Sequence, residues 1–345
     1  MNTKNKNYST KINKELEKLP DYITEFVYNH GKMNNYATKY EYSRDIYHFF
    51  EYIFHLPLFK EYRNISDIVL SDLDKINGTI INEYLNKLSL QGNKPRTLQR
   101  KRASISSMYT YFIDIGKLKN NPVAASQKIQ LEKEEFIYLT EKEQEILLYC
   151  VRTGEGLSHR KAGHHDLYVD RDSAIILLML DSGLRISELA STEIIDYDFD
   201  KCCVEVMRKI GEYQTVFFSD ECASYLQIYF DKQIDKYQLT DTHFPAFTNN
   251  YGDRLTIRSI ERMVKKYAEV AVPGKAKKIT PAKLRSSFAM SFYNASGHDI
   301  VKLQHILNHA NLATTNIYAR AADTDSEKTR NILQNARAGK KCKKK

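Results

Sequence analysis

Hydrophobic residues recur at spacings of three and four along much of this 345-residue chain, which is the pattern of helices that bury one face. In the N-terminal third we expect four such helices, at residues 22–30, 40–54, 81–90 and 96–116. Residues 117–133 lose the period and contain Pro122 among small polar residues, as is typical of an exposed linker. The pattern therefore predicts a helical domain, a linker and a second domain.

The second domain opens with a helix start signal, because Thr140 stands three residues before Glu143 and ahead of an apolar stripe. A polar segment at 158–172 reads as a loop. The apolar run that follows, residues 173–182, is too short to span a membrane and is followed by Gly183, so it predicts a core helix with a glycine cap.

Residues 202–219 alternate apolar and polar side chains on both sides of a turn at 209–212, which indicates a β-hairpin. Glycine and proline are scarce, with 13 and 7 residues, and this balance favours helices. We expect a mainly α protein with an all-helical N-terminal domain and a mixed α domain that carries a small antiparallel β-sheet. The predicted parts are a domain at 1–120, a linker at 121–137, a second domain at 138–336 and a basic tail at 337–345.

The net charge of +9 and the pI of about 9.0 indicate a polyanionic partner, with nucleic acid the first choice and an anionic membrane surface the second. No apolar run approaches the length of a membrane span, and the first residues lack the apolar core of a secretion signal, so we expect a cytoplasmic protein without membrane insertion. The odd number of cysteines without a CxxC pair fits reduced thiols and no zinc site. The pair His164-His165 is better explained as part of a polar loop than as a metal site.

Positive charge is concentrated in the N-terminal domain, where residues 1–125 hold 19 Lys and Arg against 13 Asp and Glu, a net of +6. No acidic residue occurs between Glu83 and Asp114. A charge run of this kind is either a solvated helix face or a helix that lies against DNA phosphates. The candidate DNA-binding residues in this window are Lys94, Arg96, Arg100, Lys101 and Arg102.

His309 and Tyr318 stand nine positions apart, which on one unbroken helix would separate them by about 13.5 Å on opposite faces. They converge on one target only if the chain turns between them. Asn311 or Thr314 is a suitable N-cap for a helix that begins after such a turn.

Each candidate site residue has a plain structural explanation when it is taken alone. Arg185 reads as a surface arginine paired with Glu188, three residues on, and Tyr318 as a packed aromatic among 24 tyrosines. Order and spacing together change this interpretation. The segments SGLRISEL at 182–189, RKIG at 208–211, AKLR at 282–285 and LNH with a tyrosine nine residues after its histidine resemble the tyrosine recombinases, also called the phage integrase or lambda-integrase family. Within the family the chain is most similar to the single-protein Xer recombinases of streptococcal type.

The resemblance implies a catalytic role for five residues. Tyr318 would attack a DNA phosphorus to form a 3′-phosphotyrosine, and Arg185 and Arg285 would hold the phosphate. Lys209 would be the general acid for the 5′ oxygen and His309 would hydrogen-bond the phosphate. Glu188 would orient Arg185. Neither metal, ATP nor another cofactor is expected.

One position departs from the family pattern, because Ala282 stands where the family most often has histidine. Alanine neither donates a hydrogen bond nor moves a proton. Three explanations stay open: natural drift with compensation from Lys283 or water, a slow or regulated enzyme, or a deliberately disabled one. In each case we expect slower cleavage than in a relative with histidine there.

The resemblance implies a site-specific recombinase that holds duplex DNA with inverted-repeat sites between its two domains, as a homotetramer. It serves either Xer-type dimer resolution or integration and excision of a mobile element. The helix expected at 325–336 would dock on a neighbouring protomer or, alternatively, pack on its own domain. Two other functions compete: a catalytically impaired DNA-binding protein on the recombinase fold, and a type IB topoisomerase.

Overall fold

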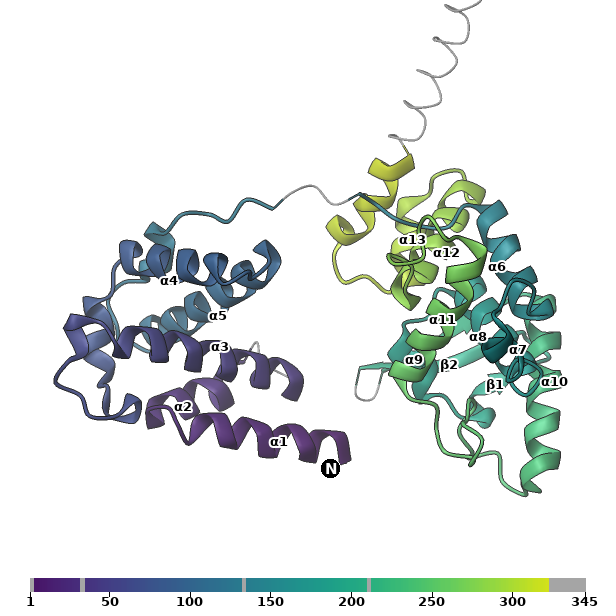
Figure 1. Cartoon of the computed structure of the whole chain (residues 1–345), viewed down its shortest axis with the longest axis horizontal. Helices are drawn as coiled ribbons and strands as arrows, with labels where there is room; N and C mark the ends of the chain where they lie inside the picture. Colours follow the sequence, from purple (N-terminus) through teal and green to yellow (C-terminus); the bar gives the residue numbers. More distant parts are fainter. Residues whose placement is uncertain (1–2, 32–34, 132–134, 210–211, 323–345) are drawn as a thin grey trace, which may run out of the picture. The chain divides into compact units, whose positions relative to one another are not determined.

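The computed structural model describes residues 3–31, 35–131, 135–209 and 212–322. The chain forms two compact units that divide between Glu134 and Glu135 (Figure 1). The first unit is helical in its described part, and the second is helical with one small antiparallel sheet. This confirms the predicted mainly α fold class.

The first unit is built from amphipathic helices around an aromatic-rich core. Helix α1 has no counterpart in the sequence prediction, yet Ile12 and Leu16 on it are buried in the shared core and it packs along α3. Asn35 and Asn77 cap α3 and α4 by accepting a backbone N–H. The helices of this unit are α1 (Thr3–Leu16), α2 (Asp21–Asn29), α3 (Tyr36–Phe54), α4 (Gly78–Leu90) and α5 (Pro95–Asp114).

The predicted linker begins too early. Pro122–Ala125 form a short 3-10 turn that packs against α4 and α5, and the Val123 side chain is buried. Arg102 on α5 donates to the Val123 carbonyl at 2.7 Å and to Ser126 Oγ at 3.0 Å. These bonds satisfy the backbone of a segment that looks polar in sequence, so residues 121–126 belong to the first unit.

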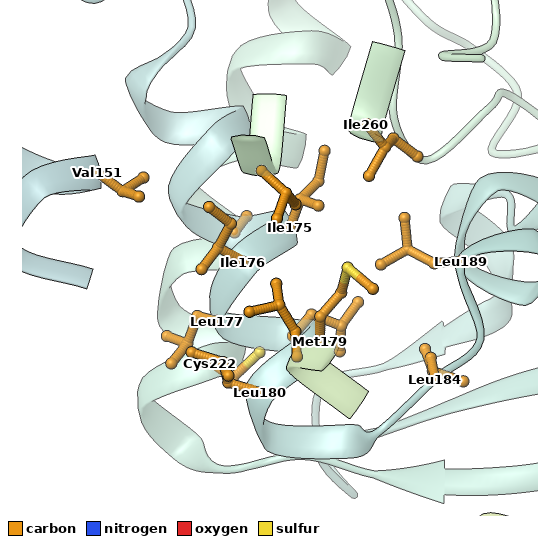
Figure 2. Packing of buried hydrophobic residues seen from close by; sticks show 14 of the residues in the cluster. Val151, Ile175, Ile176, Leu177, Met179, Leu180, Leu184, Leu189, Cys222 and Ile260 are labelled. Carbon is orange, nitrogen blue, oxygen red and sulfur yellow. The ribbon is translucent and has the colours of Figure 1, made fainter. Parts of the chain in front are cut away.

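The second unit is organised around α8, a helix that is buried on nearly all sides. Figure 2 shows Ile175, Ile176 and Met179 of α8 among side chains contributed by other elements, including Val151 and Ile260. This explains the continuous apolar run in the sequence. The helices of this unit are α6 (Glu141–Thr153), α7 (His159–Ala162), α8 (Val169–Ser182), α9 (Ile186–Ser191), α10 (Asp220–Tyr237), α11 (Ile257–Ala271), α12 (Pro281–Ala295) and α13 (Ile300–Leu307).

The predicted helix signals at the edges of this core are confirmed. Thr140 and Glu143 form the capping box of α6, and Gly183 ends α8 in the left-handed conformation, with φ of 61°. The polar loop expected at 158–172 is wrong in part, because it contains α7 and the first turn of α8. His165 within it is buried, with Nδ1 3.3 Å from the Tyr267 hydroxyl.

The predicted hairpin is confirmed as part of a three-stranded antiparallel sheet in the order β1-β2-β3. The strands are β1 (Tyr197–Asp198), β2 (Cys203–Lys209) and β3 (Glu212–Phe217). Val204 pairs with Val216, and both are buried against the core of the unit. Lys209 pairs with Glu212 at the end of the ladder, and residues 210–211 between them lie outside the described residues.

Candidate active site

Arg185 stands at a tight corner between α8 and α9. Gly183 turns the chain with its positive φ, and Arg185 itself has extended backbone before α9 begins. Glu188, on the first turn of α9, accepts the backbone N–H and the Nη1 group of Arg185, both at 2.8 Å. Nη2 of Arg185 donates to the Asn308 carbonyl at 3.3 Å. The corner therefore directs this guanidinium toward the loop that follows α13.

Glu188 is a buried carboxylate, 7% exposed, and it also forms an ion pair with Arg208 on β2. Burial raises the pKa of Glu188. The hydrogen bonds from Arg185 and the charges of Arg208 and Arg185 outweigh that effect, so its pKa lies below the ordinary value. One ionised carboxylate thus holds two guanidiniums.

Arg285 lies on α12 and is only 8% exposed. Its Nη1 donates to the Gly183 carbonyl at 2.5 Å, and its Nη2 donates to the Leu307 carbonyl at 2.6 Å. Burial, together with repulsion from Arg185, lowers its pKa to about 10, which leaves it charged at neutral pH. Its two anchors are the end of α8 and the end of α13.

The turn after α13 brings the two arginines together, although 100 positions separate them. Asn308 caps α13 in the left-handed conformation, with φ of 46°. The carbonyls of Leu307 and Asn308 then face Arg285 and Arg185 respectively. Carbonyls at a helix C-terminus lack helical partners and carry partial negative charge, which suits them to hold cations.

His309 follows this turn and contacts both Arg285 and the next helix. Its Nε2 lies 3.4 Å from Arg285 Nη2, and its Nδ1 lies 3.0 Å from the hydroxyl of the buried Thr315. Burial, with the charges of Arg285, Arg185 and Arg208, lowers the pKa of His309 to about 4. The imidazole is therefore neutral at physiological pH. An arginine side chain only donates, so Nε2 accepts from Arg285, and the proton of the neutral ring resides on Nδ1, which donates to the Thr315 hydroxyl.

The predicted turn between His309 and Tyr318 is present, with Asn311 as the cap. Asn311 Oδ1 accepts the backbone N–H of Ala313 at 2.8 Å, and residues 312–322 are helical. Thr315 and Tyr318 are three positions apart on this helix and share a face. The turn therefore places the histidine and the tyrosine against one common region.

Tyr318 is buried, 4% exposed, in a small cluster with Met290 and Leu307. Phe136 packs edge-on against its ring, with centroids 5.4 Å apart. Burial raises the pKa of the Tyr318 phenol, against opposing effects from Arg285, a hydrogen bond with Ser286, and Arg185. The phenol is thus neutral at physiological pH, and its pKa responds to both arginines.

The site has an excess of positive charge. Among the described residues, the ion pairs made by Arg185 and Arg208 both go to Glu188, and Arg285 contacts two carbonyls and the neutral His309 ring but no carboxylate. A bound phosphate group, with one or two negative charges, would offset the repulsion between the arginines that lowers the pKa of Arg285. The arrangement can bind a phosphate beside a phenol.

Comparison with known proteins agrees with this geometry. The phage integrase family matches residues 159–325, a range that includes Arg185, Arg285, His309 and Tyr318. The tyrosine recombinase XerC of Thermodesulfovibrio yellowstonii is 29% identical over 71% of this chain and 78% of that protein. The tyrosine recombinase XerS of Streptococcus equi is 25% identical over 92% of this chain and 96% of that protein. Residues 159–325 of this chain thus match the phage integrase family, the tyrosine recombinases, and the chain as a whole is similar to the Xer members of that family.

The fold of this chain is also found in a solved tyrosine recombinase structure. The XerH site-specific recombinase, in a post-cleavage complex with a palindromic difH substrate, matches with a TM-score of 0.67 at 18% identity, covering 87% of this chain and 81% of that one. The predicted resemblance to the Xer group, and to streptococcal XerS among them, is confirmed.

The structure locates two further positions of the recombinase pattern, Lys209 and Ala282. Lys209 is the last residue of β2, and the two residues after it lie outside the described residues. Ala282 is exposed on the first turn of α12, three positions before Arg285 and on the same helix face. The predicted docking helix at 325–336 and the basic tail at 337–345 lie outside the described residues.

The predicted DNA-facing cluster on α5 needs correction. Lys101 is 6% exposed and donates to the buried Asp45 carboxylate at 3.1 Å, and Arg100 pairs with the same carboxylate at 2.5 Å. Arg102 is used to hold residues 123–126. These three cations are engaged within the first unit because a buried carboxylate and buried carbonyls need partners. Lys94 and Arg96 are exposed at the start of α5 and stay candidates for DNA contact.

Two residues that the structure places in the site were not among the predicted site residues. Thr315 is one helical turn before Tyr318, and this spacing could have indicated its position in the site. Arg208 was quoted only as part of the hairpin segment. Its burial against Glu188 follows from the register of β2 and has no local sequence signal.

Among residues 3–31, 35–131, 135–209 and 212–322, no three His, Cys, Asp or Glu side chains gather closely enough to hold a metal ion. Within the same ranges, no helix has both the length and the apolar character needed to cross a bilayer.

Proposed function

We propose that this protein is a site-specific DNA recombinase of the Xer type, which cuts and rejoins duplex DNA through a 3′-phosphotyrosyl intermediate at Tyr318. The observation that carries the proposal is the convergence of Arg185 and Arg285 on the consecutive carbonyls of Leu307 and Asn308. Directly after the Asn308 cap, His309 contacts Arg285, and the helix that follows carries Tyr318.

In the proposed reaction, the scissile phosphate occupies the positive site. Arg185 and Arg285 donate to its non-bridging oxygens and stabilise the charge that grows there in the pentacoordinate transition state. Once the phosphate takes over the Arg285 Nη2 donor, Thr315 donates to Nδ1 of neutral His309, and the proton on Nε2 gives the phosphate one more hydrogen bond. A fixed tautomer of this kind keeps the donor directed at the substrate.

The chemical step exchanges one phosphodiester for another. The Tyr318 oxygen attacks phosphorus and loses its proton, the bond from phosphorus to the 5′ oxygen breaks, and Lys209 gives that oxygen a proton. A 3′-phosphotyrosine and a free 5′ hydroxyl result, and the reverse attack by a 5′ hydroxyl rejoins DNA without ATP. Because Tyr318 is buried against Phe136, cleavage requires this aromatic contact to open.

The partner in this proposal is double-stranded DNA with inverted-repeat sites, bound by a homotetramer. The reaction itself supports this, because exchange between two duplexes requires four strand cleavages. The basic balance of the chain, +9 overall, supports a DNA partner. The relative XerH was solved on a palindromic substrate, which fits an inverted-repeat target.

The test begins with a duplex selected by binding to the full chain from a random-sequence pool. Nicks are placed just 3′ of each candidate cleavage position, so that the short fragment with the free 5′ hydroxyl diffuses away after attack. We expect an SDS-resistant protein–DNA adduct with the wild type and none with Tyr318→Phe. A wild type that binds the duplex but forms no adduct with any nick would instead be a DNA-binding protein that has lost catalysis.

A second assay separates recombination from topoisomerase activity. Two plasmids, one with the selected site and one without it, are incubated with the protein. Exchange between copies of the site supports the proposal. Relaxation of both plasmids without exchange would identify a type IB topoisomerase.

A further inference from the structure

Arg208 has a buried side chain with one guanidinium nitrogen left unused within the protein. The side chain is 4% exposed. Nε donates to Gln214 Oε1 at 3.1 Å, and Nη1 forms an ion pair with the Glu188 carboxylate. Nη2 has no hydrogen-bond partner among the described residues. Unpaired buried donors are uncommon in native proteins and destabilise the fold, so Nη2 needs a partner that the described residues do not supply.

The surroundings of Arg208 hold it in place. It precedes Lys209 on β2, and Gln214 on β3 fixes its Nε. Gln214 also donates to the His305 carbonyl at 3.4 Å, which ties the hairpin to α13. Glu188 contacts the guanidinium from α9. Three elements that build the active site therefore orient this one side chain.

Electrostatics place Arg208 in the same site as the other arginines. Burial and the other charged groups have larger effects on the pKa values of Arg285 and His309, and the charge of Arg208 lowers both values further. Glu188 is shared between Arg208 and Arg185, so it does not neutralise the cluster. An anion that enters the site would both accept a hydrogen bond from the free Nη2 group and relieve this repulsion.

We propose that Arg208 is a third phosphate-binding arginine, whose Nη2 group donates to a non-bridging oxygen of the scissile phosphate alongside Arg185 and Arg285. This inference rests on the proposed function. It also gives the chain a donor in a site where Ala282, at the start of α12, supplies none. Arg208 then acts directly on the reacting phosphate and stabilises charge in the transition state.

The experiment compares cleavage rates on two suicide duplexes, one with a normal scissile phosphodiester and one with a methylphosphonate at that position. The methylphosphonate lacks the negative charge that Arg208 is proposed to bind. On the normal duplex we expect Arg208→Gln to slow cleavage by about 10²-fold, as for loss of one transition-state donor. On the methylphosphonate duplex, the factor by which Arg208→Gln slows cleavage should be smaller by about tenfold or more, because the negative charge that the arginine offsets is missing. Binding of uncleaved DNA should change little.

Arg171→Gln is the matched control. Arg171 is a partly buried arginine of the same unit, with its side chain 12% exposed, that pairs with Asp172 and donates to the Thr248 carbonyl at 3.0 Å. Any loss of rate that follows from a weakened fold should be equal on the two duplexes. An equal loss for Arg208→Gln would show that Arg208 is structural and would overturn the inference.

Arg208→Lys covers the case in which Arg208→Gln fails to fold, because it keeps a cation against Glu188. It should fold and cleave the normal duplex more slowly than wild type, with a smaller loss on the methylphosphonate. Wild-type rates in both Arg208 variants would refute this inference alone. Absence of any adduct with the wild type would refute the proposed function and the inference with it.

Discussion

Gly183→Ala tests the corner on which both halves of the site depend. Gly183 has φ of 61°, and its carbonyl accepts the Arg285 guanidinium at 2.5 Å. A Cβ at this position would lie 2.3 Å from Cδ1 of Phe288 on α12, far inside van der Waals contact. The left-handed backbone costs about 1–2 kcal/mol with a side chain, and overpacking costs about 1–3 kcal/mol more. We therefore expect a loss of about 2–5 kcal/mol in the free energy of unfolding.

Gly297→Ala is the matched control in the same unit. Gly297 has φ of 68°, and a Cβ there meets no atom within 4 Å. It should lose only the backbone contribution of about 1–2 kcal/mol. Urea titrations give both values, and suicide-duplex cleavage under folded conditions gives the effect on the site.

Cleavage should fall in Gly183→Ala, because a shift of the corner moves a carbonyl that holds Arg285. Gly297→Ala should cleave at the wild-type rate. Equal losses of stability in the two variants, or wild-type cleavage by folded Gly183→Ala, would refute the reasoning that this corner is both tightly packed and part of the site.

Three further predictions concern other parts of the chain. The fold keeps His309 neutral down to a pKa of about 4 while the unfolded chain takes up a proton below about 6.5, so the free energy of unfolding should fall as pH drops from 6.5 to 4. Urea titrations at pH 7 and 5 should show a smaller fall in His309→Gln. Ala282→His should speed adduct formation by about tenfold or more, since a hydrogen bond to a charged phosphate contributes about 1.5–3 kcal/mol; an unchanged rate in quenched time courses would exclude this. Lys101→Met should destabilise the protein by about 3–5 kcal/mol because it leaves buried Asp45 with one cation fewer, whereas Lys94→Gln should leave stability unchanged and reduce the salt slope of DNA binding by about 1. Equal salt slopes in the wild type and Lys94→Gln would remove Lys94 from the DNA surface.

Local signals in the sequence were sufficient for much of the fold. The capping box at Thr140, the glycine cap at Gly183 and the alternation in the hairpin each reflect short-range physical requirements, and the structure contains all three. The turn before Tyr318 was predicted for the same reason, since Asn311 caps a helix through its own side chain.

Predictions that depend on distant partners were less successful. The charge run on α5 resembled a DNA-binding face, but Asp45, more than fifty positions earlier, takes up Arg100 and Lys101. Residues 121–126 looked like a linker because their contacts come from Arg102. No local pattern reveals such tertiary pairs.

In the site, too, local signals were predicted and contacts between distant residues were not. Arg185, Arg285, His309 and Tyr318 were recognised from motif order, yet the carbonyls that gather them come from the backbone of α13 and its cap. Every residue has a backbone carbonyl, so the residue types do not show which carbonyls contact the arginines. Arg208 was missed for a related reason, because the importance of a hairpin arginine depends on what buries it.

The most direct test of the account is to identify the residue that becomes joined to DNA. The adduct from the wild-type protein and a suicide duplex is digested, and the peptide that carries the residual nucleotides is sequenced by mass spectrometry. We predict a single 3′-phosphate link on Tyr318, beside the region where Arg185 and Arg285 converge. A link on another residue, or through a 5′ phosphate, would contradict the account.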